Sequence, residues 1–180
     1  ELAWITGNTE ARMVDKKDTL FLHADSLKLI YDTVKQDGRY LYGFHHVKFF
    51  RKDMQGVCDS IVYSKVDSMA TMFGRPVLWN ENNQLTADTI YLWTSHQTAD
   101  SSLFKGNAFI VQEDDSIKLS YNQVKGRDMR AYFRADSLRT VYVNGNAETV
   151  YYSREEDRTL VGILYLLSSK IRLNFGGNEI

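Results

Sequence analysis

The chain has 180 residues, of which 43% are hydrophobic, 25% are charged and 13% are aromatic, and its formal net charge is -1. This length and composition are typical of a globular protein with one hydrophobic core, which predicts a single domain over residues 1–180. The charge argues against a nucleic acid partner, because domains that neutralise phosphates are clearly basic. The lone cysteine, Cys58, excludes an intrachain disulfide and is expected to be a small buried apolar residue.

Runs rich in aromatic and β-branched residues follow one another along the chain, with turn signals between them. The runs lie at residues 42–51, 60–73, 107–113, 139–145 and 148–154. The turn signals are Asp37-Gly38, Lys52-Asp53, Asn80 to Asn83, Gly106-Asn107, Asp114-Asp115, Asn144-Gly145 and Gly176-Gly177. Short strands separated by turns are typical of an antiparallel sandwich, roll or barrel. We therefore predict an all-β fold, in which only residues 10–17 and 154–158 are expected to be helix or loop.

A four-residue motif recurs along the chain, with Asp and then Ser or Thr between two apolar residues. Its copies are Ala24-Asp25-Ser26-Leu27, Cys58-Asp59-Ser60-Ile61, Ala87-Asp88-Thr89-Ile90 and Ala135-Asp136-Ser137-Leu138. Residues 121–124 form a weaker fifth copy. The copies recur about once every two predicted strands, which indicates an elongated stack of two-strand units.

The residues around each Asp of the motif show a change of phase. Most positions one and three residues before the Asp are apolar, and so are most positions two and four residues after it. Alternate residues of a strand share a face, so all these positions can face one core only if the strand shifts its phase at the Asp. A β-bulge or corner provides that shift, and Asp, Ser and Thr bond readily to the backbone groups freed there. The motif is therefore interpreted as structural, since a catalytic pair would not be needed four times.

No catalytic or metal-binding pattern is found among the residues that usually form one. The four histidines, His23, His45, His46 and His96, lack the spacing of a zinc motif, and adjacent residues of a strand point to opposite faces. The chain has no nucleophile elbow, P-loop or dinucleotide-binding fingerprint. We expect neither enzymatic activity nor a metal ion or cofactor.

Several segments of the chain occur in an order that resembles a known family. Besides the motif copies, they are Gly74-x-Pro76-x-x-Trp79, Asn122-Gln123-Val124-Lys125-Gly126-x-Asp128-Met129, Gly145-Asn146-Ala147-Glu148 and the closing GILYLLSSKIRLNF. Between about Leu20 and Phe175, this order resembles the OstA-like proteins of lipopolysaccharide transport, in particular their Bacteroidetes-type members.

The resemblance implies a twisted, open β-jelly-roll, in which two antiparallel sheets meet along one edge like a folded taco. It implies a non-enzymatic protein of the periplasm, one domain of a longer exported protein whose signal lies outside this chain. Such a protein carries or bridges lipopolysaccharide between the two membranes during outer membrane biogenesis. Its partners would be lipopolysaccharide or a related lipid and other β-jelly-roll domains joined end to end by strand addition, including copies of itself in a homo-oligomer.

Acyl chains need a continuous apolar track between the sheets, and strand parity selects candidate residues for it. The candidates are Leu27, Leu29, Ile61, Tyr63, Met72, Val77, Trp79, Ile90, Leu92, Phe109, Val111, Met129 and Phe133. The alternative is a structural or protein-interaction repeat whose sheets pack shut, with the same residues as plain core. The longest apolar run, Leu160 to Leu167, is far shorter than the roughly 20 residues that span a bilayer.

Overall fold

A computed structural model describes residues 1–14, 18–34, 37–52, 54–95, 98–113, 120–135, 137–155, 157 and 159–175. These residues form twelve β-strands and no helix, which confirms the predicted all-β class. The strands are β1 (Leu2–Val14), β2 (Thr19–Asp32), β3 (Asp37–Arg51), β4 (Met54–Ser64), β5 (Met69–Phe73), β6 (Val77–Asn80), β7 (Asn83–Thr86), β8 (Thr89–Ser95), β9 (Thr98–Glu113), β10 (Tyr121–Arg134), β11 (Ser137–Arg154) and β12 (Leu160–Asn174). The expectation of helix or loop over residues 10–14 is wrong, because they belong to β1.

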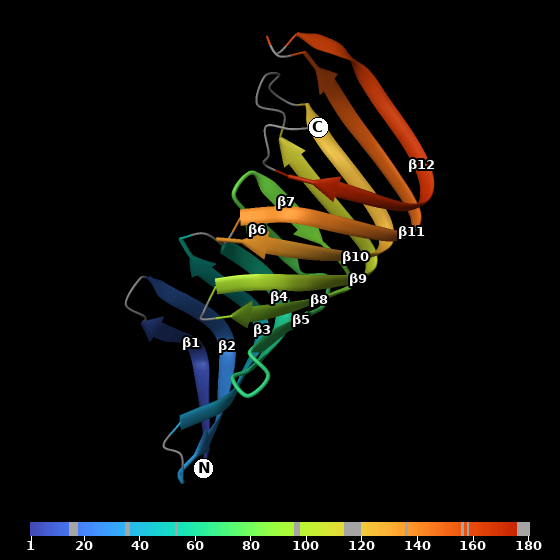
Figure 1. Cartoon of the computed structure of the whole chain (residues 1–180). Coiled ribbons are helices and arrows are strands. Elements are labelled where there is room, and N and C mark those ends of the chain that lie inside the picture. Colours follow the sequence, from blue (N-terminus) through green and yellow to red (C-terminus); the bar gives the residue numbers. More distant parts are fainter. Residues whose placement is uncertain are drawn as a thin grey trace.

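All strand pairs are antiparallel and join into one continuous sheet (Figure 1). Ten strands follow the order β1-β2-β3-β4-β5-β8-β9-β10-β11-β12, and the short hairpin β6-β7 joins β4 to β9. Strands β5 and β6 are separated only by residues 74–76, and β7 and β8 only by residues 87–88. Each of these pairs therefore acts as one strand with a bend, and the longer strands bend at the same level.

The bends fold the sheet into two facing layers (Figure 1). Layer A contains β5 and β8 with residues 2–6, 26–32, 37–44, 60–64, 98–105, 128–134, 137–144 and 170–174 of the longer strands. Layer B contains β6 and β7 with residues 9–14, 19–24, 47–51, 54–58, 108–113, 121–126, 147–154 and 160–168. The fold is thus the predicted antiparallel β-jelly-roll, with two layers that meet along one edge.

Along this bend, which we call the fold line, every second strand carries two consecutive residues with positive φ. The pairs are Gly7-Asn8, His45-His46, Gly74-Arg75, Gly106-Asn107 and Gly145-Asn146. Each strand between them has a single residue at this level. These residues are Asp25, Asp59, Asp88, Arg127 and Ser169. Two residues opposite one are a β-bulge, which shifts the register and turns the strand. The bend is therefore built into the backbone of every strand.

Three copies of the sequence motif lie on the fold line, which confirms the predicted phase shift at Asp25, Asp59 and Asp88. Ala24 and Leu27, on either side of the first shift, are both almost fully buried, although they are three residues apart. In the fourth copy, Ser137 pairs with Arg134 at the β10–β11 hairpin, away from the fold line. Its Asp136 lies outside the described residues, so the predicted phase shift there stays a prediction.

On β10, the fold line passes through residues 126–129. Arg127 there occupies the position that Asp25, Asp59 and Asp88 occupy in the three motif copies. The weaker copy at residues 121–124 lies in a regular ladder with β9 and makes no bend. The dipeptides Gly106-Asn107 and Asn144-Gly145, which were expected to be turns between strands, instead lie inside β9 and β11. Their conformation explains the error, since Gly-Asn pairs suit positive φ in hairpin turns and in bulges alike.

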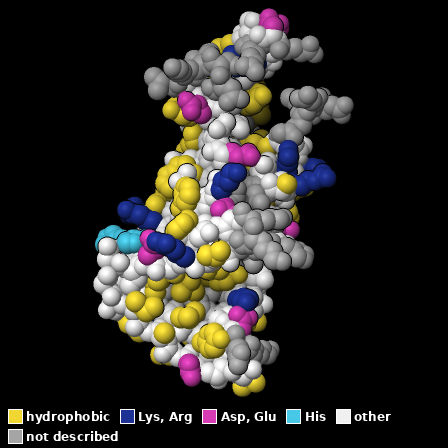
Figure 2. All heavy atoms as spheres, turned by 90° about the vertical axis from the view of Figure 1, so that its left-hand side faces the viewer, with side chains coloured by type: hydrophobic (Ala, Val, Ile, Leu, Met, Phe, Trp, Pro, Cys, Tyr) yellow, Lys and Arg dark blue, Asp and Glu magenta, His cyan; other side chains and the backbone are white. Residues whose placement is uncertain are grey.

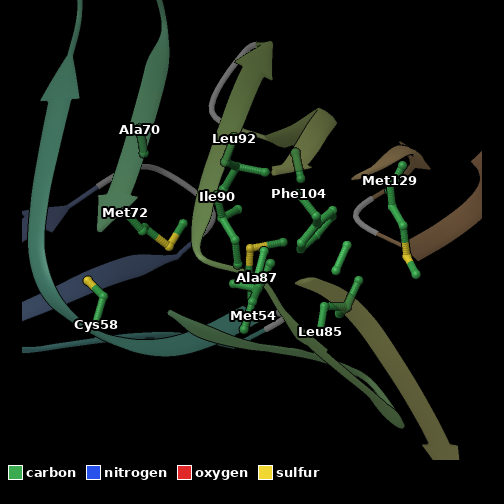
Figure 3. Packing of buried hydrophobic residues seen from close by; sticks show 14 of the residues in the cluster. Met54, Cys58, Ala70, Met72, Leu85, Ala87, Ile90, Leu92, Phe104 and Met129 are labelled. Carbon is green, nitrogen blue, oxygen red and sulfur yellow. The ribbon is translucent and has the colours of Figure 1, made fainter. Parts of the chain in front are cut away.

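The residues that face inward form one hydrophobic core between the layers (Figure 3). In layer A they include Leu27, Ile61, Met72, Ile90, Phe104, Met129 and Val143, and in layer B they include Leu22, Leu78, Leu85, Ile110 and Val124. Cross-strand partners share a face, so these residues form rows that run across the strands. Cys58 belongs to the same core, as its motif position predicted.

Candidate functional site

The strands follow one another in an elongated stack from β1 to β12. The space between the layers contains an apolar cavity of about 100 Å³ near the N-terminal end of this stack. Its lining is Met13, Leu20, Leu22, Leu41, Phe49, Arg51, Met54, Ile61, Tyr63, Ala70, Met72, Leu92, Thr94 and Ala99. Apart from Arg51, Thr94 and the hydroxyl of Tyr63, these side chains present hydrocarbon or thioether groups. An apolar space of this kind favours an alkyl ligand, because a polar ligand would lose its hydrogen bonds to water there.

Both layers contribute to the cavity, and small side chains leave room for it. Ala70 on β5 and Ala99 on β9 face inward from layer A, opposite larger residues such as Phe49 and Met54 of layer B. Met13 lies at the rim and is 41% exposed, so the lining reaches solvent. Figure 2 views the molecule from the left-hand side of Figure 1, and hydrophobic side chains gather on this side over the lower part, where the N-terminal strands lie.

In the middle of the stack, beyond the cavity, the layers are packed tightly together. Phe104 and Met129 of layer A and Leu85 of layer B are at most 1% exposed. The open edge is also bridged at this level, since Ser137 Oγ donates a hydrogen bond of 2.6 Å to Glu81 Oε1. Ser137 begins β11 in layer A, and Glu81 lies at the tip of the β6–β7 hairpin of layer B. The bridge and the packed core together define a closed section of the stack.

At the C-terminal end, the inward face of layer B becomes exposed again. Through the pairing of β9 to β12, Leu166 lies in the same cross-strand row as Ile110 and Val124, which face inward. It is 43% exposed, and Leu164 on the same face of β12 is 45% exposed. Apolar side chains that face the interior are therefore accessible at both ends of the stack.

The two outermost strands, β1 and β12, each have one edge without a partner strand in the described chain. Both carry exposed large apolar residues, among them Leu2 and Trp4 on β1 and Val161, Ile163 and Leu167 on β12. Long apolar edges of this kind can pair with a strand of another molecule.

The predicted track residues fall into three groups. Ile61, Tyr63, Met72 and Leu92 face inward and line the cavity. Leu27, Leu29, Ile90, Met129 and Phe133 also face inward but pack elsewhere in the interior. The remaining four, Val77, Trp79, Phe109 and Val111, face outward, because their neighbours Leu78, Asn80, Ala108 and Ile110 are the buried residues of β6 and β9.

The parity error has the same cause in both strands. Gly74-Arg75 precedes β6, and Gly106-Asn107 interrupts β9. Each pair shifts the alternation of inward-facing and outward-facing side chains by one residue. Trp79 instead lies on the outer face of layer B, where its indole Nε1 donates a hydrogen bond of 3.0 Å to Gln84 Oε1.

Several lining residues were missed in the sequence. Leu22 could have been found, because it stands three positions before Asp25 and shares the parity of the motif. Met13 lies in the segment that was expected to be helix or loop, and Leu20 stands five positions before Asp25. For Phe49, Met54, Ala70 and Ala99, the sequence offers no signal that sets them apart from ordinary core.

The titratable groups near the fold line have structural partners. His45 Nδ1 lies 3.3 Å from Asp59 Oδ1, and His46 Nδ1 lies 2.8 Å from Asp25 Oδ2. The hydroxyl of Ser60, followed by the ring of His45, lowers the pKa of Asp59. Burial, with the nearby charge of Asp59, raises the pKa of the Cys58 thiol to about 12, so the thiol stays protonated and unreactive at neutral pH.

The described residues offer neither a metal-binding cluster nor a membrane-spanning helix. They contain no group of three or more His, Cys, Asp or Glu side chains that could hold a metal ion. They also contain no helix with the length and hydrophobicity needed to cross a membrane.

Comparison with known proteins connects the chain to others through structure rather than sequence. No protein-family model matches the chain, and no curated protein matches its sequence. A solved structure does match: LptH of Pseudomonas aeruginosa, described as the LptA-homologous periplasmic component of the conserved lipopolysaccharide transport device. The match has a TM-score of 0.54 and 12% sequence identity, and it covers 86% of this chain and 98% of that chain. At this identity the likeness shows that the two chains share a fold.

Proposed function

We propose that this chain is a non-enzymatic periplasmic domain of the OstA-like type, which binds lipopolysaccharide or a related lipid and holds its acyl chains between the two layers. The observation that carries the proposal is the apolar cavity at the N-terminal end, with an almost wholly hydrocarbon lining. The fold shared with a periplasmic component of lipopolysaccharide transport supports both the location and the role.

The shape of the molecule explains how a long alkyl chain could enter. A cavity of about 100 Å³ holds only part of an acyl chain, so the layers must separate further when the lipid binds. They are joined continuously along the fold line, whereas the open edge near the cavity is formed by hairpins. Widening there would disrupt side-chain contacts but no ladder hydrogen bonds, which keeps its free-energy cost low.

We further propose that the free edges of β1 and β12 join this domain to others by strand addition. A partner would be another β-jelly-roll domain, including a second copy of this chain in a homo-oligomer. In such an assembly the exposed Leu164 and Leu166 would adjoin the rim of the next cavity, with Met13 on its edge. The apolar interior would then continue from one domain into the next.

Displacement of a fluorescent alkyl probe by lipopolysaccharide tests lipid binding by the intact chain. We expect displacement at micromolar lipopolysaccharide, with a loss of about tenfold or more in affinity for Ala70→Phe, whose ring fills the cavity. Val62→Phe is the matched control, because Val62 lies on the neighbouring β4 and faces outward next to Thr71. It adds the same ring outside the cavity and should leave binding unchanged.

The competing function is a structural or protein-interaction domain whose core is closed to lipid. It predicts that neither lipopolysaccharide nor a long-chain amphiphile displaces the probe at micromolar concentrations. It also predicts that Ala70→Phe and Val62→Phe change only thermal stability. Native mass spectrometry of the same samples separates the two functions, because only the lipid-binding domain would retain a bound lipid mass.

A further inference from the structure

On the outer face of layer A, next to the fold line, strands β9 to β12 surround a hollow of about 550 Å³. Its lining is Leu103, Lys105, Arg127, Asp128, Asn144, Gly145, Ser169 and Lys170. It lies on the opposite side of the layer from the interior, because Phe104, between two lining residues of β9, is 1% exposed and points into the core. Its volume is within the range of roughly 300–1,000 Å³ that is usual for small-molecule sites.

The charges around this hollow favour an anion. Asp128 is the one carboxylate in the lining, and it accepts hydrogen bonds from Arg127 Nε at 2.9 Å and from the backbone N of Gly106 at 3.1 Å. Arg127 and Asp128 therefore neutralise each other. Lys105 and Lys170 make no ion pair with any carboxylate of the described chain. Two positive charges thus remain in the hollow of a protein whose net charge is -1.

The next outward row of layer A adds cations and aromatic rings beside the hollow. Leu103, Arg130, Tyr142 and Arg172 are consecutive cross-strand partners in this row. The Arg130 guanidinium lies 5.7 Å from the centre of the Trp93 ring, and that of Arg172 lies 5.5 Å from the centre of the Tyr142 ring. Both arginines stand one row from the hollow, and their charges add to the positive potential on this face of layer A.

We infer that this hollow binds a phosphorylated saccharide. A sugar phosphate carries close to two negative charges on one compact group, which matches the two lysines. The volume exceeds what a phosphate ion alone would fill, and the rest of the lining suits a sugar. The Asn144 amide, the Ser169 hydroxyl and the Asp128 carboxylate can bond to hydroxyl groups, and Leu103 can pack against the apolar face of the ring.

This site is separate from the one in the proposed function. The lipid cavity lies between the layers at the N-terminal end, whereas the hollow lies outside layer A on the last four strands. Binding of a sugar phosphate to the hollow therefore does not depend on lipid binding. Ala70→Phe, which fills the cavity, should leave sugar phosphate binding unchanged.

Glucose 6-phosphate is a suitable probe, with glucose and inorganic phosphate as comparison ligands for the intact chain. We expect saturable binding of glucose 6-phosphate, measured by an NMR titration. The amide signals that shift should centre on Lys105, Asn144, Ser169 and Lys170. Both comparison ligands should bind about tenfold or more weakly, since each lacks one half of the contacts. Binding should weaken as salt is raised, because the lysines are exposed.

A pair of double variants separates the hollow from the general surface. Lys105→Gln with Lys170→Gln should weaken glucose 6-phosphate binding by about tenfold or more. The control, Lys48→Gln with Lys125→Gln, removes the same charge from the outer face of layer B and should leave binding unchanged.

Three outcomes would overturn the inference. The first is no saturable binding of glucose 6-phosphate, and the second is an equal loss of binding in both double variants. The third is equal affinity for inorganic phosphate and glucose 6-phosphate, which would leave no role for the sugar.

Discussion

Two stretches of the same stack, the cavity near β2 to β5 and the packed section near β7 to β10, differ in their side chains rather than in their backbones. Both are bent at the fold line by two residues of positive φ opposite a single residue. Around the cavity, Ala70 leaves space between the layers, whereas Phe104 and Met129 fill the packed section. The backbone therefore brings the layers together, and side-chain volume decides where the space between them stays open.

The largest effect is expected from truncating a side chain in each stretch. Phe104→Ala should lower the free energy of unfolding by about 3–5 kcal/mol, because its ring is enclosed by the packed core. Met72→Ala should cost about 2 kcal/mol, since one side of Met72 already borders the cavity. Urea denaturation measures both values, and both residues are 1% exposed, so the comparison is not affected by a difference in burial. Equal losses would show that the two stretches are packed alike.

A smaller effect is expected at the fold line, which both stretches share. Gly106 has a φ of +75°, and a Cβ atom there would overlap Oδ2 of Asp88. Gly106→Ala should therefore cost about 1–3 kcal/mol, measured by thermal denaturation. Gly162→Ala in β12 is the control, because no atom lies within 4 Å of the added methyl group. A harmless Gly106→Ala would mean that the bend does not depend on this conformation.

The bridge across the packed section should contribute less. Ser137→Ala removes the hydrogen bond to Glu81 and should cost about 1 kcal/mol. The loss should be local, with faster amide exchange in the β6–β7 hairpin than in the strands around the cavity. Thr140→Ala is the control, because its hydroxyl bonds to Asn174 within layer A and does not cross the open edge. Unchanged exchange in the hairpin would rule out a role for the bridge in closing the section.

The smallest effect concerns pH and the N-terminal part of the fold line. The pKa of Asp59 is lowered from 3.8 by the Ser60 hydroxyl and then by His45. A carboxyl with a depressed pKa stabilises the fold above its unfolded pKa, so this contribution is lost as pH falls below 3.8 through the folded value.

An NMR titration of the Asp59 carboxyl tests this assignment. His45→Asn replaces the imidazole, which can carry a charge, by a neutral amide like that of Asn107, which donates a hydrogen bond to Asp88 in the packed section. The pKa of Asp59 in His45→Asn should rise toward 3.8 without reaching it, because Ser60 still donates. No change in that pKa would remove His45 as a cause.

The sequence predicts the fold class and part of the fold line, because both depend on local patterns. Asp25, Asp59 and Asp88 reveal their bends through the apolar residues on either side. The Gly-Asn bends on the alternate strands were missed, since the same dipeptide forms hairpin turns. The missed bends at Gly74-Arg75 and Gly106-Asn107 placed Val77, Trp79, Phe109 and Val111 on the wrong face.

The cavity and the hollow are harder to predict, because each depends on residues that only the folded chain brings together. Whether Ala70 leaves a space depends on what faces it from layer B, about which its own strand carries no information. Lys105 and Lys170 are 65 positions apart in the chain numbering and meet only through the pairing of four strands. Charge and parity along one strand cannot reveal such sites.

The pairing order also has a consequence for how this chain folds. Apart from the β4–β6, β5–β8 and β7–β9 pairs, every strand pairs with its neighbour in the sequence. Those three exceptions all involve β5-β6 and β7-β8. Each of these pairs acts as one bent strand, and the two bent strands follow each other in the sequence. Loops between partners are short throughout, so the entropy cost of closing each one is small. Folding can therefore proceed strand by strand from the N-terminal end, before the last strands are available.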